Sequence, residues 1–231
     1  MTTLASEEIG LSKAGEARSA IAEALKQSSS ACVTCSFQAE DMVVLRLVQE
    51  VVPDIPVLFL DTGYHFPEMY AYRDEMTEKY NLNLVNVTPA RTVPEQEAEF
   101  GLLFQIKPDQ CCKFRKVEPL FAALDQYQVW FTGLRRVQSP TRANLQVLDQ
   151  FPLPTGKQLL KVSPLADWND KEVWAFAREN EIPLVSLYDA GYTSIGCQPC
   201  TALPMDPGNA RSGRWAGARK LECGIHIAEA H

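Results

Sequence analysis

Apolar residues recur along the chain at two spacings, one typical of helices and the other typical of strands. Amphipathic stretches predict helices, and short apolar or β-branched runs between them predict buried strands. Pro67 and Asn169 stand where two helices are expected to begin, and Glu172 is placed for a reciprocal capping bond with Asn169. We expect helices over residues 6–27, 38–48, 67–80, 92–99, 113–124 and 170–180, and strands over residues 31–37, 56–60, 82–87 and 128–132.

The remaining segments have less regular patterns. Residues 101–110 read as a loop, and a polar, hairpin-like stretch follows Ser139 and ends near Val162. Pro119 is expected to kink or restart the helix around it. Residues from Ile182 onward are rich in glycine and proline, and the chain has no internal repeat.

The alternation of strands and helices predicts the fold class α/β, with a mostly parallel sheet and helices on both faces. Ligands of such sheets bind outside the carboxyl ends of the strands. Ser36, Asp61 and Arg135 each come just after an expected strand. We therefore expect these three residues around one pocket.

Composition and charge narrow the function classes. With 231 residues, 46% hydrophobic and 22% charged, the chain has the composition of an ordinary globular protein. A net charge of −7 disfavours wholesale binding to nucleic acid or to an anionic membrane, although a local site for a small anion is compatible with it. No apolar run approaches the roughly 20 residues that span a bilayer. Seven cysteines without a secretory signal predict a reducing, cytoplasmic location and cysteines that act as ligands or catalysts.

Four of the cysteines form two pairs. Cys111 and Cys112 are adjacent, and Cys197 and Cys200 form a Cys-x-x-Cys. Four thiolates suit tetrahedral zinc or an iron–sulfur cluster, and spacing alone does not decide between them. Adjacent side chains point apart in regular structure, so a shared site requires a kinked backbone at the first pair. The alternative is that these cysteines are small buried apolar residues.

A second Cys-x-x-Cys and a serine follow one another at the first expected strand. In a strand, Cys32 and Cys35 would face opposite sides of the sheet, which favours core packing over a redox pair. Ser36 stands at a junction between strand and helix, where free N–H groups can bind a phosphate. The alternative for Ser36 is an ordinary helix cap.

Cationic residues lie near these features. Arg135 and Arg136, like Arg211 and Arg214, stand in glycine-containing loops, where guanidinium forks can bind phosphate or sulfate or can simply be solvated. Lys116 lies close to the first cysteine pair and could offset the negative charge of thiolate ligands. Cys223 stands in a polar segment near the C-terminus. It can be interpreted as a nucleophile or as an ordinary surface cysteine.

Taken together, seven motifs resemble the iron–sulfur type of assimilatory adenylylsulfate (APS) reductase, within the PAPS/APS reductase family. The resemblance extends from about residue 31 to residue 228. It implies an adenine nucleotide α-hydrolase-like fold, with a nucleotide- and cluster-binding domain over residues 1–200 and a mobile, catalytic tail over residues 201–231. The motifs are Ser36-Phe-Gln-Ala-Glu-Asp, Leu60-Asp-Thr-Gly, Cys111-Cys-x-x-Arg-Lys-Val-Glu-Pro, Gly133-Leu-Arg-Arg-x-Gln-Ser-Pro-Thr-Arg, Ser194-Ile-Gly-Cys-x-Pro-Cys, Arg211-x-x-Arg-Trp and Glu222-Cys-Gly-Ile-His.

The resemblance also implies residue roles. Cys223 would be the nucleophile, Lys116 would bridge cluster and substrate, and His226 would close over the substrate. One [4Fe–4S] cluster per chain would be held by Cys111, Cys112, Cys197 and Cys200. The implied substrate-binding residues are Ser36, Phe37, Gln38, Asp61, Thr62, Gly63, Lys116, Arg135, Arg136, Arg211, Arg214 and His226.

The implied reaction is reduction of APS to sulfite and AMP in sulfate assimilation, through an S-sulfocysteine that thioredoxin resolves. Neither nucleic acid nor membrane is an expected partner, and the sequence leaves a homo-oligomer open. The two cysteine pairs favour APS, although some cluster-bearing relatives accept both APS and 3′-phosphoadenylylsulfate (PAPS). The alternatives are a PAPS or dual-specificity reductase, an ATP-dependent tRNA sulfur-transfer enzyme with structural zinc, and a redox-sensing metal-binding module. The Ser36 loop lacks the Gly-Gly of ATP pyrophosphatases, which argues against the sulfur-transfer enzyme.

Overall fold

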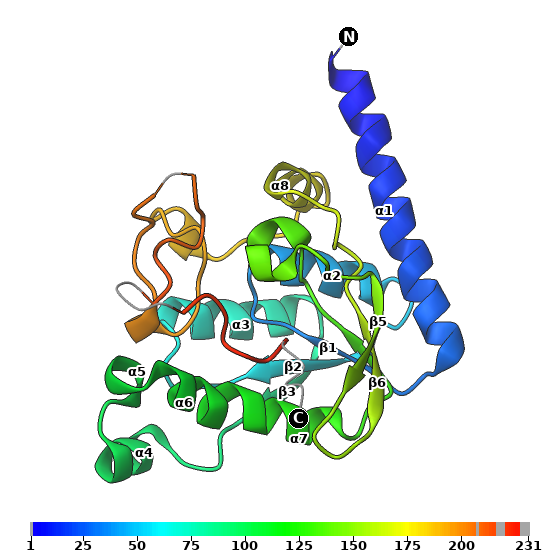
Figure 1. The fold of residues 1–231 in the computed structure, drawn as a ribbon. Helices are drawn as coiled ribbons and strands as arrows, with labels where there is room; N and C mark the ends of the chain where they lie inside the picture. Colours follow the sequence, from blue (N-terminus) through cyan, green and yellow to red (C-terminus); the bar gives the residue numbers. More distant parts are fainter. Residues whose placement is uncertain (1, 207, 216–219, 227–231) are drawn as a thin grey trace.

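A six-stranded sheet forms the centre of the computed structural model, with strands in the order β3-β2-β1-β4-β6-β5 (Figure 1). All neighbouring strands are parallel except β5, which is antiparallel to β6. The structure describes residues 2–206, 208–215 and 220–226, with side chains from residue 13 onward. The strands are β1 (Ala31–Thr34), β2 (Pro56–Leu60), β3 (Asn83–Val87), β4 (Val129–Phe131), β5 (Leu148–Pro152) and β6 (Gln158–Val162).

Helices cover both faces of the sheet, as the alternating pattern predicts (Figure 1). One face packs against α1 (Thr2–Gln27), α2 (Ala39–Gln49), α3 (Pro67–Lys79) and α8 (Asp170–Glu179), and the other packs against α7 (Glu118–Leu124). Alternate residues of a strand serve the two cores: Val33 and Phe59 lie in the first, and Leu58 and Trp130 lie in the second. Within the described residues, no helix is long and apolar enough to cross a membrane.

The order of the strands reverses beside β1. The chain moves from β1 to β2 and β3 on one side, whereas β4 and β6 lie on the other side. Val33 pairs with Val57 of β2 and with Phe131 of β4, so β1 lies in the middle of this arrangement. In open α/β sheets, ligands bind at such a switch point, outside the carboxyl ends of the strands.

Most predicted elements are present, including the capping bond of Asn169 with Glu172 at the start of α8. Residues 101–110 differ from the prediction, because they form α5 (Leu103–Ile106) and the start of α6 (Pro108–Cys112) instead of a loop. Pro108 stands in the first turn of α6, where a missing N–H costs nothing. The remaining helix is α4 (Val93–Phe100), and 3₁₀ turns form at Arg136–Gln138, Pro140–Arg142, Ser186–Tyr188 and Gln198–Cys200.

The segment after the first cysteine pair is a single π-helical turn, Lys113–Val117. It joins α6 to α7, and Pro119 stands in the first turn of α7. The helix does not restart at Pro119: it continues from α6 to α7, and its regular α-helical pattern changes to a π-helical turn just before this proline. A π-helical turn is rare and is often found at functional sites. Here it carries Lys116 and follows directly on Cys112.

Candidate active site

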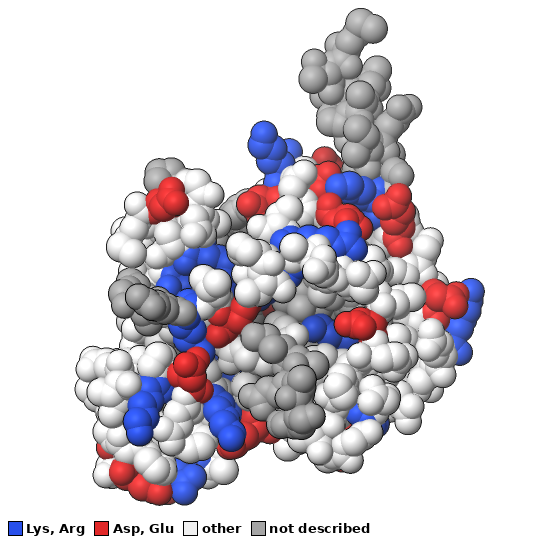
Figure 2. All heavy atoms as spheres, in the orientation of Figure 1, with Lys and Arg blue, Asp and Glu red and all other residues white. Residues whose placement is uncertain are grey.

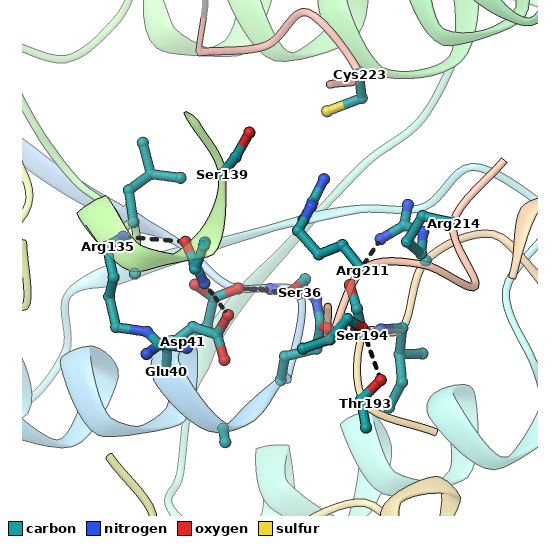
Figure 3. A pocket seen from close by; sticks show the side chains of 18 of the residues that line it. Ser36, Glu40, Asp41, Arg135, Ser139, Thr193, Ser194, Arg211, Arg214 and Cys223 are labelled. Atoms are coloured by element: carbon teal, nitrogen blue, oxygen red, sulfur yellow. Dashed lines mark hydrogen bonds between the residues drawn. The ribbon is translucent and has the colours of Figure 1, made fainter. Parts of the chain in front are cut away.

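A cavity of about 840 Å³ opens at the carboxyl ends of β1, β2 and β4. Its walls come from the loops after β1 and β4, from residues 191–196, and from the C-terminal segment (Figure 3). Nine residues that the sequence predicted for the site line this cavity: Ser36, Gln38, Lys116, Arg135, Arg136, Arg211, Arg214, Cys223 and His226.

Four other predicted residues are not at the cavity wall. Phe37 is fully buried in the core, with its ring 5.6 Å from that of Phe59. Asp61 accepts a hydrogen bond from the Tyr70 hydroxyl at 2.6 Å and one from the N–H of Gly63 at 3.0 Å. Thr62 is buried, and its Oγ1 lies 3.3 Å from Sγ of Cys197. In place of Asp61, Thr62 and Gly63, the cavity is lined by the last strand residues Leu58, Phe59 and Leu60.

The loop after β1 already holds an anion of its own. The Asp41 carboxylate accepts hydrogen bonds from the N–H and the hydroxyl of Ser36, at 2.7 and 2.6 Å. Burial and nearby Glu40 together raise the pKa of Asp41 to about 6, against the lowering effect of the two Ser36 bonds. Gly133 packs directly on Asp41, so that a larger residue would collide with its carboxylate. The donors of Ser36 are therefore satisfied from within the protein.

Most arginines at the cavity wall are paired with carboxylates, and Figure 2 shows basic and acidic side chains side by side on this face. Arg135 donates to Asp170 at 2.7 Å, and Arg136 pairs with Asp167. The sequence assigned no role to Arg142, which donates through Nε and Nη2 to the Glu222 carboxylate at 2.9 and 2.7 Å.

Two cations at the cavity differ from these. Within the described residues, neither Lys116 nor Arg214 lies within 4.0 Å of a carboxylate oxygen. Arg214 donates to Ser194 Oγ at 3.4 Å and lies 4.6 Å from the centre of the Trp215 ring. Burial lowers the pKa of Lys116, but the nearby thiolates of Cys197, Cys223 and Cys112 together raise it above its usual value. Neither side chain is therefore paired with a carboxylate in the described residues, although Lys116 also interacts with the Cys197 thiol.

The four paired cysteines converge although they come from distant parts of the chain. Cys111 and Cys112 stand at the end of α6, and Cys197 and Cys200 stand around a 3₁₀ turn in which Cys200 N–H donates to the Cys197 carbonyl at 2.9 Å. All four line one small cavity together with Arg115, Lys116 and Arg214. Among the described residues, no three His, Cys, Asp or Glu side chains are grouped as a site for a single metal ion.

The chemistry of this donor set fits an iron–sulfur cluster. Four free cysteines are buried or half-buried, as cluster thiolates are. Three cationic side chains at the same small cavity would offset the charge of such a cluster, and Thr62 can donate a hydrogen bond to the Cys197 sulfur.

Cys223 is half-buried and faces the cavity from the C-terminal segment (Figure 3). Three residues further on, the His226 ring stacks on Trp130, with 5.3 Å between ring centres. The His226 carbonyl accepts a hydrogen bond from Nζ of Lys161 at 3.4 Å. Burial lowers the pKa of Lys161 to about 8. No role was predicted for Lys161, although it is the one charged residue within the otherwise apolar residues 159–162.

Comparisons with known proteins place this geometry in a family. The phosphoadenosine phosphosulfate reductase domain model matches residues 30–203. The adenosine 5′-phosphosulfate reductase of Geobacillus kaustophilus is 45% identical over 199 residues, which are 84% of this chain and 82% of the relative. That of Mycobacterium tuberculosis is 44% identical over 200 residues, 84% of this chain and 78% of the relative.

Solved structures support the same fold. The phosphoadenylyl-sulfate (PAPS) reductase of Candida auris superposes with a TM-score of 0.68 at 24% identity, over 81% of this chain and 90% of that one. The FMN adenylyltransferase of Candida glabrata gives 0.63 at 18% identity, over 86% and 67%. The domain model covers most of the chain, and the relatives match over most of their own length. The chain therefore belongs to the phosphoadenosine phosphosulfate reductase domain family.

Proposed function

We propose that this protein reduces APS to sulfite and AMP in sulfate assimilation, with thioredoxin as the reductant. The observation that carries the proposal is that Cys223, Lys116 and Arg214 line the same cavity. A free thiol therefore shares this cavity with two cations that have no carboxylate partner within the described residues. The names of the relatives, and the two cysteine pairs, favour APS over PAPS.

The cavity offers each part of the substrate a suitable surface. Leu58, Phe59, Leu60 and Met69 provide an apolar wall at the strand ends for the adenine ring. Arg214 and Lys116 would bind the phosphosulfate, because they line the cavity and neither is paired with a carboxylate in the described residues. Arg135 and Arg136 also line the wall, but the carboxylates of Asp170 and Asp167 already neutralise part of their positive charge. Arg211 is likewise partly neutralised, because its guanidinium lies 3.6 Å from the Glu222 carboxylate.

The first half-reaction is an attack by Cys223 on the sulfate sulfur. A bond forms between the thiolate and that sulfur, and the bond from sulfur to the bridging phosphate oxygen breaks. Its electron pair leaves with AMP, and the products are AMP and an S-sulfocysteine. Arg214 and Lys116 stabilise the charge that develops on the leaving phosphate, since they are fixed in place before the reaction begins.

The second half-reaction consumes a dithiol. A thioredoxin thiolate attacks the Cys223 sulfur, and sulfite leaves with the electron pair of the broken bond. The second thiol of thioredoxin then resolves the mixed disulfide and regenerates Cys223. The dithiol thus supplies both electrons, and the half-exposed position of Cys223 gives the partner access.

The four paired cysteines would hold one [4Fe–4S] cluster, which would give electrostatic and structural support to the site when bound. Because thioredoxin supplies both electrons, no residue of the chain has to relay them. Lys116 lies between the small cysteine-lined cavity and the large cavity, and lines both. We propose that Lys116 links the two sites through its charge. We further propose that the protein works in the cytoplasm, and that the segment after residue 200 moves as a tail.

Sulfite release from APS and from PAPS, with thioredoxin under anaerobic conditions, tests the proposed function. We expect sulfite and AMP from APS, and none from the Cys223→Ser variant. Sulfite release from PAPS alone would show that PAPS is the substrate, and the proposed mechanism would still apply. No release from either nucleotide would contradict the proposal and favour a sulfur-transfer or redox-sensing role.

A further inference from the structure

We propose that Glu222 is a positioning residue whose ion pair with Arg142 closes the C-terminal segment and holds the Cys223 sulfur at the substrate. This inference rests on the proposed function. It assigns a role to a carboxylate that stands next to the nucleophile in sequence, where negative charge would otherwise oppose the thiolate. The role follows from the contacts of Glu222, which tie the segment to a loop 80 residues away.

The Glu222 carboxylate is held by more contacts than a surface ion pair. Arg142 donates two hydrogen bonds in a fork, at 2.9 and 2.7 Å, and the Thr141 hydroxyl donates a third at 3.0 Å. Arg211 approaches to 3.6 Å. The side chains of Glu222 and Arg142 are only 8% and 11% exposed. Bidentate, charge-assisted bonds of this kind fix orientation as well as distance.

The loop that supplies this fork is itself braced. Arg142 ends a 3₁₀ turn, and Ser139 accepts a hydrogen bond from Thr141 N–H at 3.3 Å at the start of that turn. Arg142 also donates to Gln138, and the Gln138 amide donates to Glu40 of α2. The fork therefore presents a fixed anchor to Glu222.

Cys223 lies between this anchor and a second one. Ile225 packs against the core under the sheet, and His226 stacks on Trp130. Gly224 has φ +93, a conformation that glycine adopts readily and that turns the chain between the two anchors. With one anchor on each side, the sulfur of Cys223 is confined to the wall of the cavity that Arg214 and Lys116 also line.

The pairing also separates the two half-reactions. Attack on the sulfate requires the closed segment, because the thiolate must reach the substrate in a fixed orientation. Release of sulfite requires only that thioredoxin reach the Cys223 sulfur. Loss of the Glu222 anchor should therefore slow the first half-reaction and leave the second as fast as before. A purely structural residue would affect both.

The test measures the two half-reactions in Glu222→Gln, which is nearly isosteric but uncharged. Single-turnover formation of the S-sulfo-enzyme is followed by mass spectrometry against APS concentration, and sulfite release is then followed from the isolated adduct with reduced thioredoxin. Glu50→Gln is the matched control, since Glu50 accepts a similar fork from Arg18, at 2.6 and 2.8 Å, outside the cavity. Arg142→Lys keeps the charge and loses the fork.

We expect the maximum rate of adduct formation to fall about tenfold or more in Glu222→Gln, and less in Arg142→Lys. The APS concentration at half-maximal rate and the rate of sulfite release should stay at the wild-type values, as should every rate in Glu50→Gln. An unchanged maximum rate in Glu222→Gln would overturn the inference. So would a change in half-saturation alone, which would make Glu222 a binding residue, or an equal slowing of both half-reactions. Absence of any adduct in the wild-type protein would instead refute the proposed function.

Discussion

The chain contains two Cys-x-x-Cys sequences, and their surroundings differ in almost every respect. Cys32 and Cys35 lie at β1, where Cys32 is packed in the core below the sheet and Cys35 in the core above it. Cys197 and Cys200 lie around a 3₁₀ turn and share one small cavity with Cys111 and Cys112. The first pair is surrounded by apolar side chains, whereas Lys116 and Arg214 line the cavity of the second.

The difference shows that spacing alone does not determine the chemistry of two cysteines. An extended backbone sends residues three apart to opposite faces, while a tight turn can bring them together. In the second group, burial raises the pKa of Cys111, Cys112 and Cys200, whereas at Cys197 nearby groups, Lys116 foremost, outweigh burial and lower the pKa. Cys223 stands with the second group, because it lines the larger cavity together with Lys116 and Arg214.

The largest expected effect is at Cys223. Cys223→Ser should reduce sulfite formation to the background level, since a serine hydroxyl cannot form the S-sulfo-enzyme. Its iron content should remain that of the wild type. Cys32→Ala should retain turnover, because Cys32 is buried in the core and does not line the cavity. Turnover in Cys223→Ser would show that another cysteine is the nucleophile, and loss of iron there would contradict the division of roles.

The second effect concerns iron. Cys197→Ala should lose most of its iron and acid-labile sulfide, because each of the four thiolates is required as a ligand. Cys32→Ala has the same change at the first position of the other Cys-x-x-Cys, and should keep both. Iron and sulfide analysis of anaerobically purified proteins gives the answer. Equal loss in the two variants would mean that the distinction between the pairs is wrong.

A smaller effect is expected from the cations that distinguish the second pair. Arg214→Lys keeps the positive charge but loses the fork, so adduct formation should slow by about tenfold. Arg91→Lys is the control, because Arg91 pairs with Glu99 at the exposed surface. Rapid-quench measurements of AMP release would detect the difference. Equal rates of AMP release in the two variants would show that Arg214 does not bind the phosphosulfate.

The smallest effect is on stability and its dependence on pH. Burial raises the pKa of the Cys32 and Cys35 thiols, so the folded protein keeps protons that the unfolded chain releases above about pH 8.5. Their contribution to stability therefore falls as pH rises above that value. Cys35→Ala should cost about 1–2 kcal/mol of unfolding free energy at pH 7.

The cost of Cys35→Ala should also shrink between pH 8 and pH 10, because the variant has lost one of these thiols. Urea unfolding of both proteins at the two pH values measures this difference in unfolding free energy. The lowered pKa of Lys161 affects both proteins equally, so its contribution cancels in the difference. A cost that grows with pH would indicate a thiolate at Cys35 in the folded protein.

The pattern of the chain was sufficient to predict the sheet, its helices and the opposite-facing cysteines of β1. It did not predict the short helices at residues 103–112, because four to five residues carry too little periodicity. Which arginines are paired with carboxylates was even harder to predict from the sequence. The partners of Arg135 and Arg142 lie 35 and 80 residues away, so only the folded chain shows which cations are already neutralised.

The central claim is that Cys223 attacks the sulfate sulfur of APS. Mass spectrometry of anaerobically purified protein, incubated with APS and separately with PAPS in the absence of thiols, tests it directly. The account predicts a sulfonate adduct on the peptide that contains Cys223 after incubation with APS. Protein that retains its iron but forms no adduct with either nucleotide would contradict the account.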